Sequence, residues 1–116
     1  DSTINVDYCL HKLTGIVDKL LVYPDAMLHN MNRTGGLIYS QRILVALVNK
    51  GILRQTAYVW VQRNAMKRWL EKEDFRTNVE KDADISAHLT KEEIDACFDY
   101  QYFLRNVDDI FARFDL

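Results

Sequence analysis

The spacing of apolar residues is the feature of this sequence that most constrains its fold. Near the start of the chain, large aliphatic side chains recur at steps of three and four residues: Val6, Leu10, Leu13, Val17 and Leu20. Steps of this length place side chains along one face of an α-helix. We therefore predict a long amphipathic helix that ends near Tyr23, immediately before a proline.

Proline and glycine divide the next part of the chain into further helices. Pro24 disfavours helical geometry in the residue before it but fits the first turn of a new helix, so a second, short helix is expected through Arg33. Gly35 and Gly36 break that helix, and Gly51 is the expected C-cap of the next one. The apolar face of this third helix is formed by Ile43, Leu44, Leu47 and Val48. A helical hairpin follows from this order.

A fourth helix is predicted from about residue 53 to residue 71. Its expected buried face consists of Tyr58, Val61, Ala65 and Trp69, and its opposite side carries Arg63, Lys67 and Arg68. Polar residues opposite an apolar stripe are normally exposed to solvent, so we expect the basic side to be solvated. The charged stretch from Glu71 to Asp84 is weakly periodic. We expect it to be the least ordered part, with Phe75 and Val79 anchoring a short helix or turn.

The last part of the chain predicts two more helices. Thr90 and Glu93 have the spacing of a capping box, which predicts a helix start and a short helix to about Phe98. Asp99 is a suitable cap for the final helix, and an aromatic and aliphatic stripe is expected to join the core: Phe103, Val107, Ile110 and Phe114. With one proline and four glycines in 116 residues, the chain has few turn formers for a sheet-rich protein. The predicted fold class is all-α.

Composition excludes several classes of protein. The net charge is −2, so there is no general positive field for a phosphate backbone, and we expect no nucleic-acid partner. The apolar runs are too short to span a membrane. Cys9 and Cys97 are far apart and lack CxxC spacing, which favours reduced thiols in the cytoplasm over a disulfide.

The inventory of reactive residues predicts no catalytic centre, metal site or cofactor. His11, His29 and His88 are scattered, and each is expected to have a surface or packing role. A set of residues has the spacing of calcium ligands in an EF-hand: Asp82, Asp84, Ser86 and Glu93. However, Ala87 stands where that loop needs glycine for its sharp turn, and the capping box already explains Glu93. We therefore predict that no calcium binds.

One segment offers a weak candidate for anion binding. Arg33 precedes the Gly35-Gly36 turn, and Ser40 and Arg42 lie on the helix after it. Backbone amides, a hydroxyl and guanidinium groups are suitable ligands for an anion. However, glycine pairs before a helix are usually only turns, and Ser40 and Arg42 point to different sides of a helix. A structural role is favoured for the segment.

A longer string adds what periodicity alone cannot. The run from Met27 to Arg42, MLHNMNRTGGLIYSQR, closely resembles the C-terminal region of bacterial adenylosuccinate lyases. Further matching segments follow in the family's order: Ile43 to Leu47, Gly51, Ala57-Tyr58, Val61-Gln62, Ala65-Met66, Phe75-Arg76, Leu89-Thr90, Phe98-Asp99 and Val107 to Arg113. The resemblance covers essentially the whole chain. The segment Thr34 to Arg42 separates this lyase from other members of the fumarase and aspartase superfamily.

The resemblance implies a homotetrameric enzyme of purine biosynthesis. It cleaves adenylosuccinate to AMP and fumarate, and SAICAR to AICAR and fumarate, by β-elimination without a cofactor. The family's catalytic histidines, its serine loop and its phosphate-binding cluster are expected to precede Asp1. The serine loop contains two prolines, and the only proline here is Pro24. No catalytic residue is therefore carried over, and the fragment alone is predicted to be inactive.

The same resemblance predicts the domain organisation. Residues 1–22 resemble the end of a long helix from the central tetramerisation bundle, and residues 23–116 resemble the small C-terminal helical domain. Removed from its bundle, the stripe from Val6 to Leu20 is expected to self-associate or fray. Two other interpretations stay open: a stand-alone helical protein-interaction module, and a small anion-binding domain that uses Arg33 and Arg42.

Overall fold

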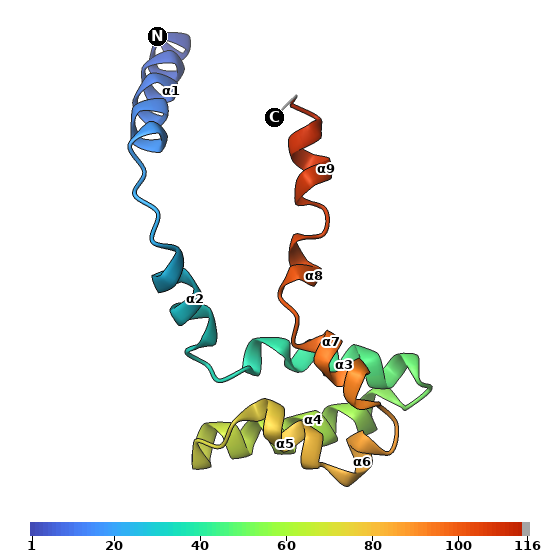
Figure 1. The fold of residues 1–116 in the computed structure, drawn as a ribbon. Coiled ribbons are helices and arrows are strands. Elements are labelled where there is room, and N and C mark those ends of the chain that lie inside the picture. Colours follow the sequence, from blue (N-terminus) through green and yellow to red (C-terminus); the bar gives the residue numbers. More distant parts are fainter. Residues whose placement is uncertain (115–116) are drawn as a thin grey trace. The chain divides into compact units, whose positions relative to one another are not determined.

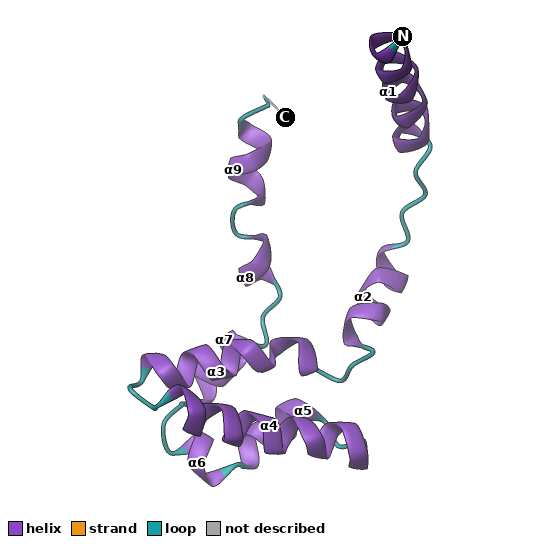
Figure 2. Ribbon diagram, turned by 180° about the vertical axis from the view of Figure 1, so that it is seen from behind, coloured by secondary structure: helices purple, strands orange, loops and turns teal. Residues whose placement is uncertain are grey.

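The computed structural model describes residues 1–114, and helices and connecting turns account for all of them. No strand occurs within this range, so the all-α prediction is confirmed (Figures 1 and 2). The chain divides into two compact units: the first comprises Asp1–Asn30, and the second begins at Met31.

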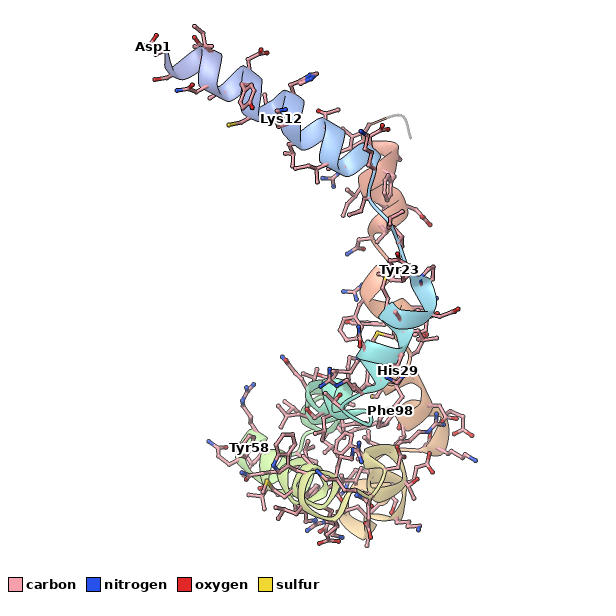
Figure 3. The ribbon with its side chains drawn as sticks, turned by 90° about the vertical axis from the view of Figure 1, so that its left-hand side faces the viewer. Asp1, Lys12, Tyr23, His29, Tyr58 and Phe98 are labelled. Carbon is pink, nitrogen blue, oxygen red and sulfur yellow. The ribbon has the colours of Figure 1, made fainter. Side chains whose placement is uncertain are left out.

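The first unit contains α1 (Ser2–Asp18) and most of α2 (Pro24–Asn32). Figure 3 shows the side chains of α1 standing free on all sides of the helix, and none of its residues is buried. The helix ends at Asp18, so the predicted end near Tyr23 is wrong. A helix whose apolar face has no packing partner in its unit gains little from a further turn, and the residue before Pro24 resists helical geometry. Helix α2 begins at Pro24, as expected.

The second unit is built around one core. The elements around this core are the 3₁₀ turn η1 (Leu37–Tyr39), α3 (Ser40–Asn49), α4 (Arg54–Glu71), α5 (Phe75–Lys81), α6 (Ala83–Ser86) and α7 (Lys91–Cys97). Their fully or almost fully buried apolar side chains include Ile43, Leu47, Ala57, Phe75, Val79, Ile85 and Ile94. Helices α3 and α4 pack against each other (Figure 1), so the predicted hairpin is confirmed.

The turn between α3 and α4 has the geometry that its glycine predicts. Gly51 has a φ of +89°, in the left-handed region that glycine adopts without strain. The Ile52 amide donates to the Leu47 carbonyl at 3.2 Å, which is the long hydrogen bond of a Schellman motif. Gly51 therefore closes the helix as expected, although the C-cap itself is the preceding residue, Lys50.

The buried face of α4 differs from the prediction. The buried residues are Ala57, Val61 and Asn64, whereas Tyr58 is 55% exposed and Trp69 is 64% exposed. Figure 3 shows Tyr58 on the outer side of the helix. The buried stripe includes an asparagine, which an analysis of apolar residues assigns to solvent. Val61 and the partly buried Ala65 therefore lie on the predicted face, whereas Tyr58 and Trp69 do not.

The charged stretch after α4 is well folded, contrary to the expectation that it would be the least ordered. It forms α5 and α6. Phe75 and Val79 are completely buried in the core, so the prediction that they anchor this stretch is confirmed. Each helix begins at an aspartate whose carboxylate accepts backbone amides: Asp74 accepts from Thr77, and Asp82 accepts from Asp84 and Ile85. These caps supply local stability that hydrophobic periodicity does not reveal.

The C-terminal part begins as predicted and then departs from the prediction. Thr90 and Glu93 form the full capping box at the start of α7. The Asp99 carboxylate accepts the Gln101 amide at 2.9 Å, at the start of α8.

Beyond Asp99, two short helices, α8 (Gln101–Leu104) and α9 (Val107–Ala112), replace the single helix that was expected (Figure 2). The predicted core stripe is not buried, and Phe114 is 71% exposed. The core is formed by helices α3 to α7 and does not include the stripe.

Candidate functional site

The three predicted anion-binding residues are not gathered into one site. Arg33 is exposed in the turn after α2, Ser40 is the first residue of α3, and Arg42 lies one half-turn further along α3. No hydrogen bond in the described part of the chain joins any two of them. Residues two positions apart on a helix point in divergent directions. The arrangement therefore offers separate groups rather than a preformed anion cradle.

Arg42 makes internal contacts of its own. Its Nη2 donates to the Ala96 carbonyl at 3.0 Å, near the end of α7. Its guanidinium carbon lies 3.4 Å from the centre of the Tyr102 ring on α8, within the range of a cation–π contact. Arg105 stacks on the same ring at 3.9 Å. Arg42 thus ties α3 to the end of α7 and to α8.

A groove of about 460 Å³ lies beside Arg42, between α3 and α8. The residues that line it are Ile38, Gln41, Arg42, Val45, Ala46, Asn49, Cys97, Tyr102 and Phe103. Burial raises the pKa of the Cys97 thiol, although the neighbouring Arg42 opposes that shift. A thiol with a raised pKa is a poor nucleophile at neutral pH, so the groove is better suited to binding than to covalent chemistry.

A polar cluster on α4 was missed by the sequence analysis. Arg63, which was expected to be solvated, donates from Nε to the Asp82 carboxylate at 2.7 Å and also pairs with Asp84. Asn64 Nδ2 donates to Asp82 at 2.6 Å. The only hint in the sequence is the position of Asp82 and Asp84 after a helix rich in basic residues. The cluster holds α4 against the start of α6.

The ionisation of Asp82 follows from these contacts. Burial alone raises the pKa of this carboxyl, but the hydrogen bonds from Arg63, Asn64 and the Ile85 amide outweigh burial and lower the pKa below its ordinary value. Its oxygens therefore already accept hydrogen bonds within the chain.

The residues with calcium-like spacing do not form a metal site. Glu93, the last of them, accepts a hydrogen bond from the Thr90 amide and pairs with Lys50. No group of side chains in residues 1–114 is arranged to hold a metal ion.

The turn that carries Arg33 is held by a second arginine of α4. Arg68 Nε donates to the Thr34 carbonyl at 3.2 Å, and its Nη1 donates to the Lys72 carbonyl at 2.9 Å. Gly35 has a φ of +61°, and a Cβ at this position would lie 2.1 Å from Arg68 Nε. The expectation that Arg68 is simply solvated is therefore wrong, whereas Lys67 is exposed. Close approach of the guanidinium requires glycine at position 35.

The three histidines are exposed in the structure. His11 and His29 are exposed on α1 and α2. His88 Nδ1 lies 2.8 Å from the Asp84 carbonyl oxygen, and its ring lies 5.5 Å from that of Trp60. A general acid and a general base need to converge on one substrate, and the contacts of His88 are with a backbone carbonyl and a tryptophan ring rather than with a second acid or base. None of the helices described has both the length and the apolar character needed to cross a bilayer.

Comparison with known proteins identifies the family. Residues 36–114 match the family described as "Adenylosuccinate lyase C-terminus". The chain is also 51% identical over 113 residues to the adenylosuccinate lyase of Staphylococcus saprophyticus subsp. saprophyticus, an alignment that covers 97% of this chain and 26% of that enzyme. The chain thus spans about a quarter of the length of this relative. The chain belongs to the adenylosuccinate lyase family and corresponds to its C-terminal region.

Proposed function

We propose that residues 23–116 form the C-terminal domain, and residues 1–22 the end of a central-bundle helix, of an enzyme that cleaves adenylosuccinate to AMP and fumarate, and SAICAR to AICAR and fumarate, by β-elimination. The observation that carries the proposal is the 51% identity to a curated adenylosuccinate lyase along nearly the whole chain. Identity this high over 113 residues supports a common role for the matched region. The enzyme acts in purine biosynthesis in the cytoplasm.

In this proposal the domain supports catalysis without performing it. Two observations support this proposal. The histidines are scattered along the sequence, and the carboxylates of Asp82 and Glu93 already accept hydrogen bonds from other residues of the chain. The groups that remove and deliver protons come from other regions of the enzyme, and those regions bind most of the substrate. Among the three candidate ligands, Arg33 is the one whose side chain is exposed, whereas Arg42 is engaged with Ala96 and Tyr102. We assign any contact with the substrate to Arg33.

The exposed stripe of α1 supports an oligomeric enzyme. Its large aliphatic side chains on the predicted face are each more than half exposed: Val6, Leu10, Leu13 and Val17. A continuous apolar stripe at helical spacing gains free energy when it packs against other helices. We propose that α1 contributes to the helical bundle of a homotetramer.

A chimeric enzyme tests the proposed function. The matching C-terminal region of the Staphylococcus saprophyticus enzyme is replaced by this chain, and fumarate release from adenylosuccinate is followed by absorbance. We expect the chimera to release fumarate, and the same enzyme with the region deleted to release none. The chain by itself is expected to release none, and turnover by the chain alone would show that the chemistry lies within it.

The exposed apolar residues also favour a second candidate function, a stand-alone module that binds a partner helix. Large apolar side chains of α8 and α9 are at least two-fifths exposed, among them Phe103, Ile110 and Phe111. Exposed apolar surface of this kind is typical of interaction sites. A folded but inactive chimera would favour this second function, whereas an active chimera would favour the lyase.

A further inference from the structure

The groove between α3 and α8 contains a positive charge without a counter-ion. Arg42 lines the groove, and no aspartate or glutamate is present in its lining. Arg42 forms no ion pair with any residue of the described range, and its Nη1 is buried without a hydrogen-bond acceptor there. A buried donor without an acceptor is unfavourable, and a charged one more so. The groove therefore lacks a carboxylate-like acceptor.

The contact with Tyr102 does not supply that acceptor. The ring attracts the positive charge of the guanidinium, but it provides no oxygen for Nη1. Helix α8, which carries Tyr102, has only four residues, and none of them is buried. A helix so short and so weakly packed can shift to admit a group beside Arg42.

The rest of the lining indicates what kind of group fits. Apolar side chains come from both helices, from Ile38, Val45 and Ala46 on the η1–α3 side and from Phe103 on α8. The amides of Gln41 and Asn49 add hydrogen-bonding groups. An apolar lining with one cation and a few polar groups suits an apolar body that carries a single carboxylate.

We propose that this groove is the docking surface for an aspartate or glutamate, flanked by apolar residues, from the part of adenylosuccinate lyase that lies outside these 116 residues. This inference rests on the proposed function, because it requires the chain to work within the longer enzyme. That enzyme has ample further chain, since this region matches only 26% of the relative. The carboxylate completes the hydrogen bonding of Arg42 and fixes α3 and α8 to the rest of the enzyme.

Zero-length cross-linking in the chimeric enzyme tests the docking surface. Arg42→Lys keeps the positive charge and introduces an amine that a water-soluble carbodiimide joins to a carboxylate in direct contact. Lys50 and Glu93 provide an internal positive control, because their charged atoms lie 2.6 Å apart. The parent chimera, with Arg42, is the matched negative control, because a guanidinium does not react.

We expect peptide mass spectrometry of the Arg42→Lys chimera to find the introduced amine joined to an aspartate or glutamate outside the 116 residues. A link from this amine to Asp108 or Asp109 of α9 would overturn the proposal. The absence of any link at position 42, in a sample that contains the Lys50–Glu93 link, would overturn it as well. Fumarate release is measured on the same sample. An inactive chimera that still forms the expected link contradicts the proposed function and leaves the docking surface supported.

A second measurement uses the chain itself and does not depend on the chimera. Octanoate serves as the probe because it joins one carboxylate to an apolar chain, and octylammonium is the control with the opposite charge. We expect octanoate, but not octylammonium, to shift the NMR signals of Val45, Ala46 and the Arg42 side chain. Arg42→Met should weaken octanoate binding about tenfold, and Arg42→Lys should restore most of it. Equal binding of the two probes, or none of octanoate, would overturn the proposal.

Discussion

Asp82 shows how a single buried carboxylate can organise several elements. It accepts hydrogen bonds from Arg63 and Asn64 of α4 and from two backbone amides at the start of α6. Its side chain is only 5% exposed, whereas that of Arg63 is 41% exposed. Asp82 is therefore the more buried member of this ion pair. Removing its carboxylate leaves several hydrogen-bond donors without an acceptor.

Asp82→Asn should lower the free energy of unfolding by about 2 kcal/mol at neutral pH, because breaking a buried charge pair leaves unsatisfied groups behind. Since the pKa of Asp82 is lowered in the folded chain, its stabilisation is present above the unfolded pKa of about 3.9 and is lost as the pH falls through the folded value. The free energy of unfolding, measured with urea at several pH values, should differ between parent and variant at neutral pH, and this difference should shrink below about pH 4.

Asp84→Asn is the matched control for this prediction. Asp84 contacts the same arginine, but its side chain is 49% exposed, so its loss should cost less than about 1 kcal/mol. Equal losses for the two variants would show that burial of Asp82 is not what gives the cluster its strength.

Gly35 provides a second test at the scale of single residues. Gly35→Ala introduces strain at a φ of +61° and displaces the Arg68 guanidinium from the Thr34 carbonyl. Gly51→Ala introduces the same kind of strain at +89°, but no atom lies within 4 Å of the added Cβ. We expect Gly35→Ala to lower the free energy of unfolding by about 1 kcal/mol more than Gly51→Ala.

Repeating both glycine substitutions in an Arg68→Ala variant separates the backbone strain at the glycine from the loss of the Arg68 contact. Without the guanidinium, the two alanine variants should differ much less in their urea midpoints. If the difference persists unchanged in that background, contact with Arg68 is not its cause.

Helix α5 contributes more to the core than its weak apolar periodicity predicts. Phe75 is completely buried, whereas Phe111 of α9 is 51% exposed. Phe75→Ala should lower the free energy of unfolding by about 4 kcal/mol through lost burial and a new cavity. Phe111→Ala should change it by less than about 0.5 kcal/mol. Thermal unfolding followed by circular dichroism measures both, and similar effects would contradict the assignment of α5 to the core.

Much of the helical order could be predicted because its signals are local. Pro24 starts α2, Gly51 ends α3 and the Thr90–Glu93 box starts α7. Each of these depends on backbone geometry or on a hydrogen bond within a few residues. Family membership was likewise predictable from the run between Met27 and Arg42, which carries the resemblance.

The errors arise where contacts distant in sequence decide the outcome. Asn64 is buried on α4 because Asp82, far along the chain, accepts its amide. The same carboxylate accepts hydrogen bonds from Arg63, whose side chain stays 41% exposed. The groove beside Arg42 depends on the meeting of α3 with Tyr102. Apolar periodicity ranks residues by hydrophobicity alone, so it cannot find polar groups that are buried in pairs.

The two units differ in how much of their apolar surface is covered. The second unit has a closed core, but α1 has no buried residue. Exposed stripes of this size are typical of surfaces that pack against other helices. The isolated chain therefore retains an apolar surface that, in the proposed tetramer, belongs to the central bundle.

We expect the isolated chain to associate through α1 in a concentration-dependent way. Replacing Leu10 and Leu13 by glutamate places charges in the stripe and should shift the sedimentation velocity toward that of a monomer. Tyr8→Glu is the matched control, because Tyr8 is also exposed but lies on the other side of α1. The helical content of the second unit should be unchanged in every variant, since its core does not include α1. A parent chain that sediments as a monomer at all concentrations would show that the stripe alone does not drive association.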